Sequence, residues 1–307
     1  MTYMTTAQTA TFNKVDMELE VSNILNASPL LQVLAARTCQ SNVFYYTRAL
    51  TAPAVGFRAA NDGIVQTATV REKVTCTLGI LDASFAVDIA VAQVDERGYQ
   101  HVLGAEAIQH LTQAMFEVES QVIYGTANDA AGFDGLAQST SYDTTGDAMV
   151  ISAGGETLAG CSSVWAIKQG PGDVEVLWGQ GGVLTIGDLQ IIERAGSATG
   201  FFPAYYHHIT GWAGLKVGST YSVGRLANID QVATHTLDDD MLSSLLALFP
   251  IGREPDYFLM SRRSRKQLQQ SRTATNATGA PAPIPLEAFG VPIIASDAVL
   301  NTENPIS

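Results

Sequence analysis

Apolar residues recur at helical spacing between residues 101 and 124. Successive apolar positions lie four, four, four, three and four residues apart, which keeps them on one face of a helix. Gly125 follows, and glycine ends helices readily because it accepts a left-handed backbone. The pattern predicts a helix over 101–124, about 36 Å long at a rise of about 1.5 Å per residue. Its apolar positions are Leu103, Ala107, Leu111, Met115, Val118 and Val122.

Strand-forming residues on either side of a polar stretch predict a long hairpin. One strand begins at 44–47 and the other covers 70–81, both rich in β-branched and aromatic residues. Between them, Asn61, Asp62 and Gly63 form a turn signal. Two strands without a core are marginal in water, so we expect the hairpin to lie on another surface.

Residues 162–230 alternate short apolar runs with glycine-rich turns, which predicts two further pairs of strands. Strands 164–167 and 174–178 surround the turn 170–173. Strands 205–217 and 221–229 surround Gly218 and Ser219.

The C-terminal part has the order of a small α/β unit. Three aspartates from Asp238 precede the apolar run 241–249, where they suit a helix start. A strand over 257–260 and a helix over 262–272, capped by Ser261, precede a loop and a strand over 291–294. The N-terminal residues 1–43 resemble an arm, with an amphipathic helix predicted over 21–36.

Composition and charge exclude several classes of protein. The net charge is −13 over 307 residues, and 15% of residues are charged, against about 25% in an ordinary globular chain. An acidic chain is a poor nucleic-acid binder. The printed sequence has no apolar run of the kind found in secretory signals or membrane spans, so we expect neither. Since interface cores are depleted in charge, we expect other protein to cover part of this surface.

The residues that usually carry chemistry are sparse. His207 and His208 would point to opposite faces of a strand, and the glycine-rich loop 179–182 lacks the context of a nucleotide-binding motif. Helix capping is a better interpretation of Asp238, Asp239 and Asp240 than cation binding. We expect no enzyme activity, no cofactor and no metal, and we expect buried thiols. The cysteines are Cys39, Cys76 and Cys161.

A basic cluster stands out between residues 262 and 272. One interpretation is that the cluster contacts phosphate or an acidic surface of a neighbouring subunit. The other is that it is the solvated face of one helix. The sequence leaves both interpretations open. Its members are Arg262, Arg263, Arg265, Lys266 and Arg272.

The order of local motifs resembles that of tailed-bacteriophage major capsid proteins. The runs 119–125 and 132–136 resemble the end of a spine helix and the loop that follows it in this family. The runs 212–230 and 290–303 are similar to segments of one branch of the family. Together these motifs span most of residues 44–303.

The resemblance implies an α+β, Hong Kong-type capsid fold. Its parts would be an N-terminal arm at 1–43, an E-loop hairpin at 44–80, a peripheral P-domain at 81–232 with spine helix 101–124, and an axial A-domain at 233–307.

The resemblance also implies a structural role and a set of partners. The chain would form pentamers and hexamers of an icosahedral head around double-stranded DNA, which its acidity would keep from adhering. A portal protein, a separate scaffolding protein and possible decoration proteins would join it, with no membrane. Assembly would take place in the host bacterial cytoplasm, and the mature location would be the virion capsid.

Charged residues on the hairpin are the candidate contacts between subunits. We expect Arg58, Asp62 and Arg71 to meet a neighbour, with Glu117 and Glu119 as acidic partners; solvent-exposed charges of little energetic worth are the alternative. The basic residues Arg262, Arg263 and Arg265 are further interface candidates. The hairpin tip has no lysine, so we predict a shell without covalent crosslinks.

Two other functions remain open from the sequence. An encapsulin-like compartment would share the fold and carry a cargo-peptide site instead of a genome. A soluble α/β enzyme using loop 179–182 would bind a small ligand as a monomer.

Overall fold

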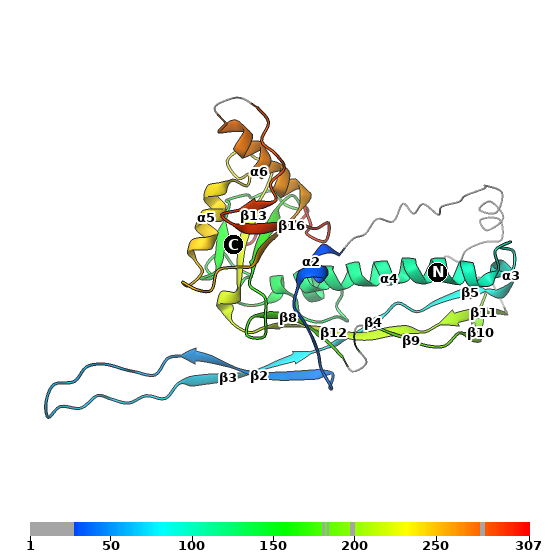
Figure 1. Ribbon diagram of the computed structural model, residues 1–307, viewed down its shortest axis with the longest axis horizontal. Coiled ribbons are helices and arrows are strands. Elements are labelled where there is room, and N and C mark those ends of the chain that lie inside the picture. Colours follow the sequence, from blue (N-terminus) through cyan, green and yellow to red (C-terminus); the bar gives the residue numbers. More distant parts are fainter. Residues whose placement is uncertain (1–27, 180–181, 183, 197–199, 277–279) are drawn as a thin grey trace.

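The computed structural model describes residues 28–179, 182, 184–196, 200–276 and 280–307. It has three parts: a long helix lying over elongated sheets, a compact lobe at one end of that layer, and a hairpin projecting away from both (Figure 1). Residues 1–27 of the predicted arm and residues 180, 181 and 183 near the glycine-rich loop lie outside the described residues.

The long helix α4 is the central element of the first part. It covers Tyr99–Tyr124 and begins two residues before the predicted start. It ends where Gly125 adopts φ +58°, the left-handed backbone expected of a terminating glycine. The last seven residues, from Val118, are all buried. A short helix α3, Ile89–Ala92, precedes it and is capped by Asp88.

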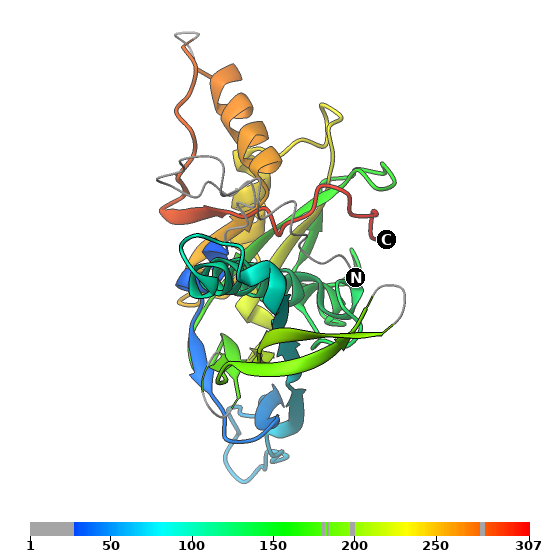
Figure 2. The same ribbon diagram turned by 90° about the vertical axis from the view of Figure 1, so that its right-hand side faces the viewer.

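Two sheets lie along this helix, and Figure 2 shows α4 end-on above the β10–β11 ribbon. The five-stranded sheet has the order β1-β8-β12-β4, with β9 also paired to β12. The three-stranded sheet has the order β10-β11-β5. The strands are β1 Ala36–Thr38, β4 Gly79–Asp82, β5 Phe85–Asp88, β8 Val174–Trp178, β9 Thr185–Ile186, β10 Gln190–Ala195, β11 Phe201–His207 and β12 Ile209–Val217.

The compact lobe is a mixed six-stranded sheet with two helices. Its strand order is β15-β16-β14-β7-β13-β6, and β7, β13 and β14 are buried along their whole length. The strands are β6 Val150–Ser152, β7 Ser162–Ile167, β13 Val223–Ile229, β14 Tyr257–Met260, β15 Glu287–Ala288 and β16 Val291–Ala295; the helices are α5 Asp239–Ala247 and α6 Arg262–Ala274.

Local signals in the C-terminal part are confirmed. The Asp238 carboxylate accepts a hydrogen bond from the Met241 amide at 2.8 Å, and the Ser261 hydroxyl accepts one from the Ser264 amide at 3.1 Å. Strands β14 and β16 are parallel and joined through α6. The strand–helix–strand order predicted from sequence is therefore present.

The predicted boundary between residues 232 and 233 divides a single sheet and is corrected. Strand β7 pairs with β13 on one side and with β14 on the other. Residues after 233 therefore complete a sheet that begins at β6.

The two predicted strand pairs between residues 162 and 230 are wrong. Gly170 and Asp173 do form a turn, but β7 and β8 on either side of it belong to different sheets. The same holds for β12 and β13. Fully buried strands have partners on both sides, and those partners here are distant in sequence.

The predicted long hairpin is present. Strands β2 Val43–Thr51 and β3 Val70–Thr77 pair in antiparallel register, and Thr51 faces Val70. The helix predicted over 21–36 is shorter in its described part: α2 covers Pro29–Val33, and Ala36 already belongs to β1. Three-residue 3₁₀ helices occur at Gly125–Ala127, Leu136–Gln138 and Thr220–Ser222.

The chain is α+β, as predicted, with a continuous core. The main buried cluster runs from the C-terminal turns of α4 through β8 and β12 into the compact lobe. A smaller cluster lies between the first half of α4 and β5. The hairpin tip, residues 52–69, contributes nothing to either cluster.

Candidate assembly surfaces

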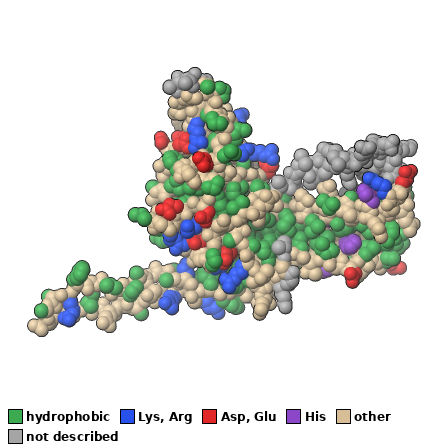
Figure 3. All heavy atoms as spheres, viewed as in Figure 1, with side chains coloured by type: hydrophobic (Ala, Val, Ile, Leu, Met, Phe, Trp, Pro, Cys, Tyr) green, Lys and Arg blue, Asp and Glu red, His purple; other side chains and the backbone are tan. Residues whose placement is uncertain are grey.

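The hairpin carries an exposed apolar surface. Val55 and Val65 are 89% and 80% exposed, and Phe57 is fully exposed. Figure 3 shows this arm projecting from the body with apolar and basic side chains along it. Burying apolar surface lowers the free energy by about 25 cal/mol per Å², so a contact that covers this arm would be stabilised. Its exposed large apolar residues are Tyr45, Leu50, Val55, Phe57, Ile64, Val65 and Val70.

The predicted contact residues of the hairpin all lie on this arm. The Arg58 guanidinium donates to the carbonyl of Asp62 at 3.2 Å, and the Asp62 carboxylate accepts from the Gly63 amide at 2.8 Å. Asn61 has φ +64°, which an asparagine tolerates in a tight turn. Arg71 is exposed and faces Ala49 on β2.

The root of the hairpin packs against a buried ion pair that joins β8 and β12. The Lys216 ammonium lies 2.6 Å from the Glu175 carboxylate, with both side chains about 5% exposed. It also lies 5.7 Å from the ring centre of Tyr46, whose hydroxyl donates to the Val217 carbonyl at 2.5 Å. Burial raises the pKa of Tyr46 to about 12. The hairpin is therefore anchored at its root and free at its tip.

Glu119 does not lie on an assembly surface, which corrects the sequence prediction. It is fully buried, and its carboxylate accepts hydrogen bonds from the Leu30 and Leu31 amides at 2.9 and 3.4 Å and from the Ser296 hydroxyl. Burial raises the pKa of this carboxyl. It joins α2, α4 and the C-terminal segment within one subunit. Glu117, two residues earlier, is half-buried and accepts from Asn128 at 2.5 Å.

The basic helix α6 is mostly engaged within its own subunit. Arg263 donates to the carbonyls of Gly160, Ile229 and Asn301 at 2.9 to 3.2 Å. Arg272 forms a two-bond pair with Asp239, and Arg262 pairs with Asp297. Arg265 is half-buried and Lys266 is exposed. The solvated-face interpretation therefore fails for Arg263 and Arg272.

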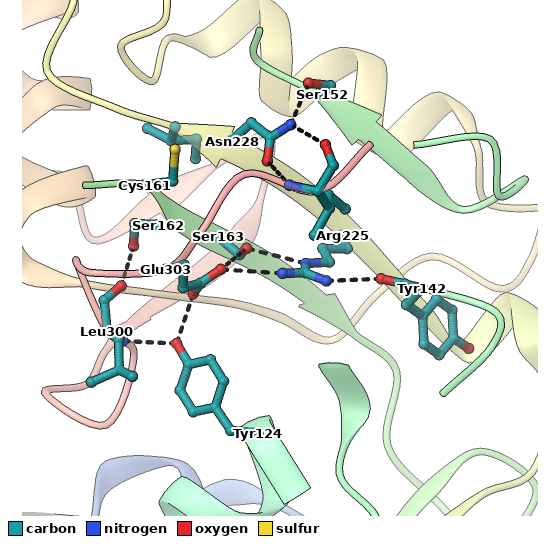
Figure 4. Close-up of polar contacts among 12 residues, drawn as sticks. Tyr124, Tyr142, Ser152, Cys161, Ser162, Ser163, Arg225, Asn228, Leu300 and Glu303 are labelled. Carbon is teal, nitrogen blue, oxygen red and sulfur yellow. Dashed lines mark hydrogen bonds and ion pairs between the residues drawn. The ribbon is translucent and has the colours of Figure 1, made fainter. Parts of the chain in front are cut away.

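A second buried ion pair fixes the C-terminal segment. The Arg225 guanidinium donates to Glu303 at 3.1 Å, to the Ser163 hydroxyl at 3.1 Å and to the Tyr142 carbonyl at 2.9 Å (Figure 4). The Tyr124 hydroxyl at the end of α4 donates to Glu303 at 2.7 Å. The long helix, the six-stranded sheet and the C-terminal segment are thus held together at one point.

The loop after α4 is organised by one glutamine. The Gln121 side-chain amide donates to the carbonyls of Asp129 and Phe133 at 3.1 and 2.8 Å, and its oxygen accepts from the Asp129 amide at 3.2 Å. A Cβ on Gly132 would lie 2.2 Å from Gln121 Nε2. This close contact explains why glycine stands there.

The described residues show no arrangement suited to metal chemistry. Among them, no group of three or more His, Cys, Asp and Glu side chains could hold a metal ion. The three cysteines are free; Cys39 and Cys161 are buried and Cys76 is half-buried. Burial raises the pKa of all three, that of Cys76 to about 11, which makes them poor nucleophiles. None of the described helices is both long and apolar enough for a membrane span.

Comparison with known proteins shows the family to which the chain belongs. A family model described as "Major capsid protein GP7" matches residues 18–307. The chain belongs to this family. The family match confirms the resemblance seen in the order of the sequence motifs, and the chain is a structural protein of a capsid. None of the curated proteins matches it in sequence.

Solved capsid structures share the fold of this major capsid protein. The bacteriophage Epsilon15 protein aligns with a TM-score of 0.68 at 18% identity, covering 100% of this chain and 98% of that one. The bacteriophage JBD30 capsid aligns with a TM-score of 0.51 at 10% identity, and a JBD30 capsid decorated with minor capsid protein trimers with 0.52 at 12%. Each covers 94% of this chain and 98% of the other. The Hong Kong-type fold is therefore confirmed.

Several organising residues of this capsid protein were missed in the sequence. Gln121, Lys216 and Arg225 each act on partners that lie elsewhere in the chain, such as Glu303, 78 positions from Arg225. The glycines after α4 were the one signal available in the sequence. They indicate a tightly packed loop but do not identify Gln121 as the residue packed against it.

Proposed function

We propose that this capsid protein assembles as pentamers and hexamers into the icosahedral head of a tailed phage, with its hairpin lying across an adjacent subunit. The observation that carries this is the exposed apolar arm on a rigid root. An isolated two-stranded arm is marginal, while a repeated contact gains stability through multivalency.

The net charge of −13 supports a head that encloses double-stranded DNA without gripping it. In this proposal a scaffolding protein and a portal protein take part in assembly, which takes place in the bacterial cytoplasm. The chain itself catalyses no step. A decoration protein is supported by the JBD30 capsid, which carries minor capsid protein trimers. The family match favours a phage head over a cellular compartment.

We assign the parts of the subunit accordingly. The hairpin is the E-loop, and α4 with the two sheets along it is the P-domain with its spine helix. The compact lobe, including β6, β7 and β13, is the axial A-domain. Among the basic residues of α6, Arg262 and Lys266 are exposed and Arg265 is half-buried, so these three are the candidates to meet a neighbour in this lobe.

The shell is held without covalent crosslinks in this proposal. The tip carries Arg58 and no lysine, and Lys73 on β3 lies 4.0 Å from the ring centre of Tyr45 on its own hairpin. Boiled mature particles should run as single subunits on a denaturing gel. A ladder of linked subunits would contradict this part of the proposal.

Electron microscopy of the expressed chain tests the proposal, with a scaffolding protein supplied where the chain alone gives few particles. We expect closed shells or ring-shaped capsomers. A protein that stays monomeric at high concentration under both conditions would overturn the proposed assembly.

A further inference from the structure

The hairpin tip carries an aspartate followed by a glycine, a pair with a backbone chemistry of its own. Asp62 and Gly63 are both exposed. They belong to the segment between β2 and β3, which forms the far end of the arm (Figure 1). In such a pair the glycine amide nitrogen can attack the side-chain carbon of the aspartate and close a five-membered succinimide ring. Glycine favours the attack because it has no Cβ to crowd the nitrogen.

The geometry of the tip brings the two reacting groups together. The Gly63 amide nitrogen lies 2.8 Å from Oδ1 of Asp62, and Oδ1 is bonded to the carbon that the nitrogen attacks. The Asp62 amide instead donates to the Ala59 carbonyl at 3.2 Å, which disfavours the same reaction at the preceding Asn61. Because contact between reacting groups speeds ring closure, Asp62 is the reactive position of this turn.

Ring closure and ring opening together convert the aspartate into its isomer. The Gly63 nitrogen bonds to Cγ of Asp62 in its protonated carboxyl form, and the amide proton leaves with the carboxyl OH as water. Water then adds to one of the two ring carbonyls and breaks the bond from that carbon to nitrogen, which regains a proton. Opening at Cγ restores aspartate. Opening at the main-chain carbonyl leaves Gly63 linked through Cγ, an isoaspartyl linkage with a free α-carboxylate, and no group is oxidised or reduced.

Arg58 lies at the carbonyl where the isoaspartyl linkage arises. Its guanidinium donates to the main-chain carbonyl oxygen of Asp62 at 3.2 Å. Negative charge develops on that oxygen when water adds to its carbon, and a cation placed there stabilises it. The α-carboxylate that results forms a charge-assisted hydrogen bond with the same guanidinium. Arg58 therefore favours the isoaspartyl product over the return to aspartate.

A second aspartate–glycine pair in the chain lacks this freedom. Asp134 is exposed, but Gly135 is buried. A Cβ on Gly135 would lie 2.3 Å from the Gly125 nitrogen and 2.6 Å from the Gln121 carbonyl oxygen, so the backbone here packs tightly against the end of α4. Ring closure has to turn the glycine amide toward the aspartate side chain, and this packing opposes the movement. The second pair therefore serves as an internal control.

We propose that the unassembled subunit isomerises spontaneously at Asp62, and that Arg58 directs the reaction to the isoaspartyl product. This chemistry belongs to the single subunit and does not rest on the proposed assembly. The negative charge moves from the Asp62 side chain to the main chain beside Arg58, and the turn becomes longer by one methylene group. The tip of the arm thus carries a modification site that changes its surface while the subunit stays unassembled.

Peptide mapping of the aged subunit tests the site. The full-length subunit is incubated below the concentration at which it assembles, and electron-transfer fragmentation of its digest distinguishes isoaspartyl from aspartyl peptides. We expect isoaspartate to accumulate several-fold faster at Asp62 than at Asp134. In urea, where neither loop keeps its structure, the two rates should converge. Equal rates at the two positions in the folded subunit would overturn the proposal.

A glycine variant checks that the reaction passes through the ring. Gly63→Ala should slow the isomerisation at Asp62 several-fold, because the methyl group crowds the attacking nitrogen. A Cβ at this position meets nothing within 4 Å, so the unfolding midpoint of the variant should not change. An undiminished rate in Gly63→Ala would contradict the proposed ring closure.

Labelled water tests the part played by Arg58. In water enriched in heavy oxygen each ring opening leaves one labelled oxygen, so both products can be counted. Arg58→Gln should lower the isoaspartyl share of the labelled product in the folded subunit and leave it unchanged in urea. Arg58→Lys, which keeps the charge, should restore part of the share. A share that Arg58→Gln does not alter in the folded subunit would overturn the directing role.

Discussion

Single buried charges connect segments of this subunit that are far apart in sequence. Arg225 and Glu303 are 5% and 8% exposed, and between them they bond to partners on α4, on β7 and in the loop at Tyr142. Removing one member of such a pair leaves the other charge buried and uncompensated. These residues act within one subunit, in contrast to the exposed charges of the hairpin.

Replacing Glu303 tests this connection. Glu303→Gln should lower the free energy of unfolding of the unassembled subunit by about 3–5 kcal/mol, because Arg225 would keep its charge without a counter-ion. Urea unfolding followed by fluorescence measures the change. Glu156→Gln, at an exposed carboxylate, is the control and should stay within about 0.5 kcal/mol. Equal effects of the two variants would show that the buried pair adds nothing.

Glu119 gives the subunit a pH-dependent stability. Burial raises its pKa above the ordinary value of 4.5, so the folded subunit holds the proton more tightly than the unfolded chain. Stability should therefore fall as the pH rises from about 4.5 through the raised pKa. Glu119→Gln, which keeps the shape and stays neutral, should gain relative to the parent over this interval in urea titrations. A difference that does not change with pH would refute the assignment.

At this scale the sequence predicted exposed residues better than buried ones. Arg58 and Asp62 stand beside a turn signal, and turns lie on the surface. Glu119 looked exposed because a carboxylate usually is. Its backbone and hydroxyl donors come from Leu30 and Ser296, which no local pattern associates with it.

The loop folded around Gln121 constrains the end of α4. Gly132→Ala would place a Cβ 2.2 Å from the buried Gln121 amide, and overpacking of this kind costs about 1–3 kcal/mol. Thermal unfolding of the subunit should show the loss. Gly146→Ala is the matched control, since the nearest atom to its new Cβ is 3.8 Å away. An unchanged midpoint for Gly132→Ala would mean that the loop yields freely.

Helices and their caps were predictable because their signals are local. The spacing of apolar residues located α4, and Asp238 and Ser261 located the starts of α5 and α6. The pairing of strands was not predictable in the same way. β7 and β8 are buried on every side, so they lack the alternation that assigns a face, and their partners come from distant segments.

The whole molecule combines an acidic, charge-poor body with a basic, apolar arm. The scarcity of charge noted in the sequence agrees with a surface shared among identical copies. The overall fold was accessible from the order of motifs along the chain, which the family match confirms. The division into lobes could not be predicted from that order, because the six-stranded sheet contains strands from both sides of the expected boundary between residues 232 and 233.

The central claim is that the hairpin tip stabilises the assembly and not its own subunit. Residues 52–69 can be replaced by Asn-Gly, since Thr51 and Val70 already face each other and a two-residue turn can join them. Thermal unfolding of the shortened subunit should give an unchanged midpoint. Sedimentation velocity, with electron microscopy of the fractions, should show that it no longer forms shells. Shells formed by the shortened chain as readily as by the parent would contradict the account.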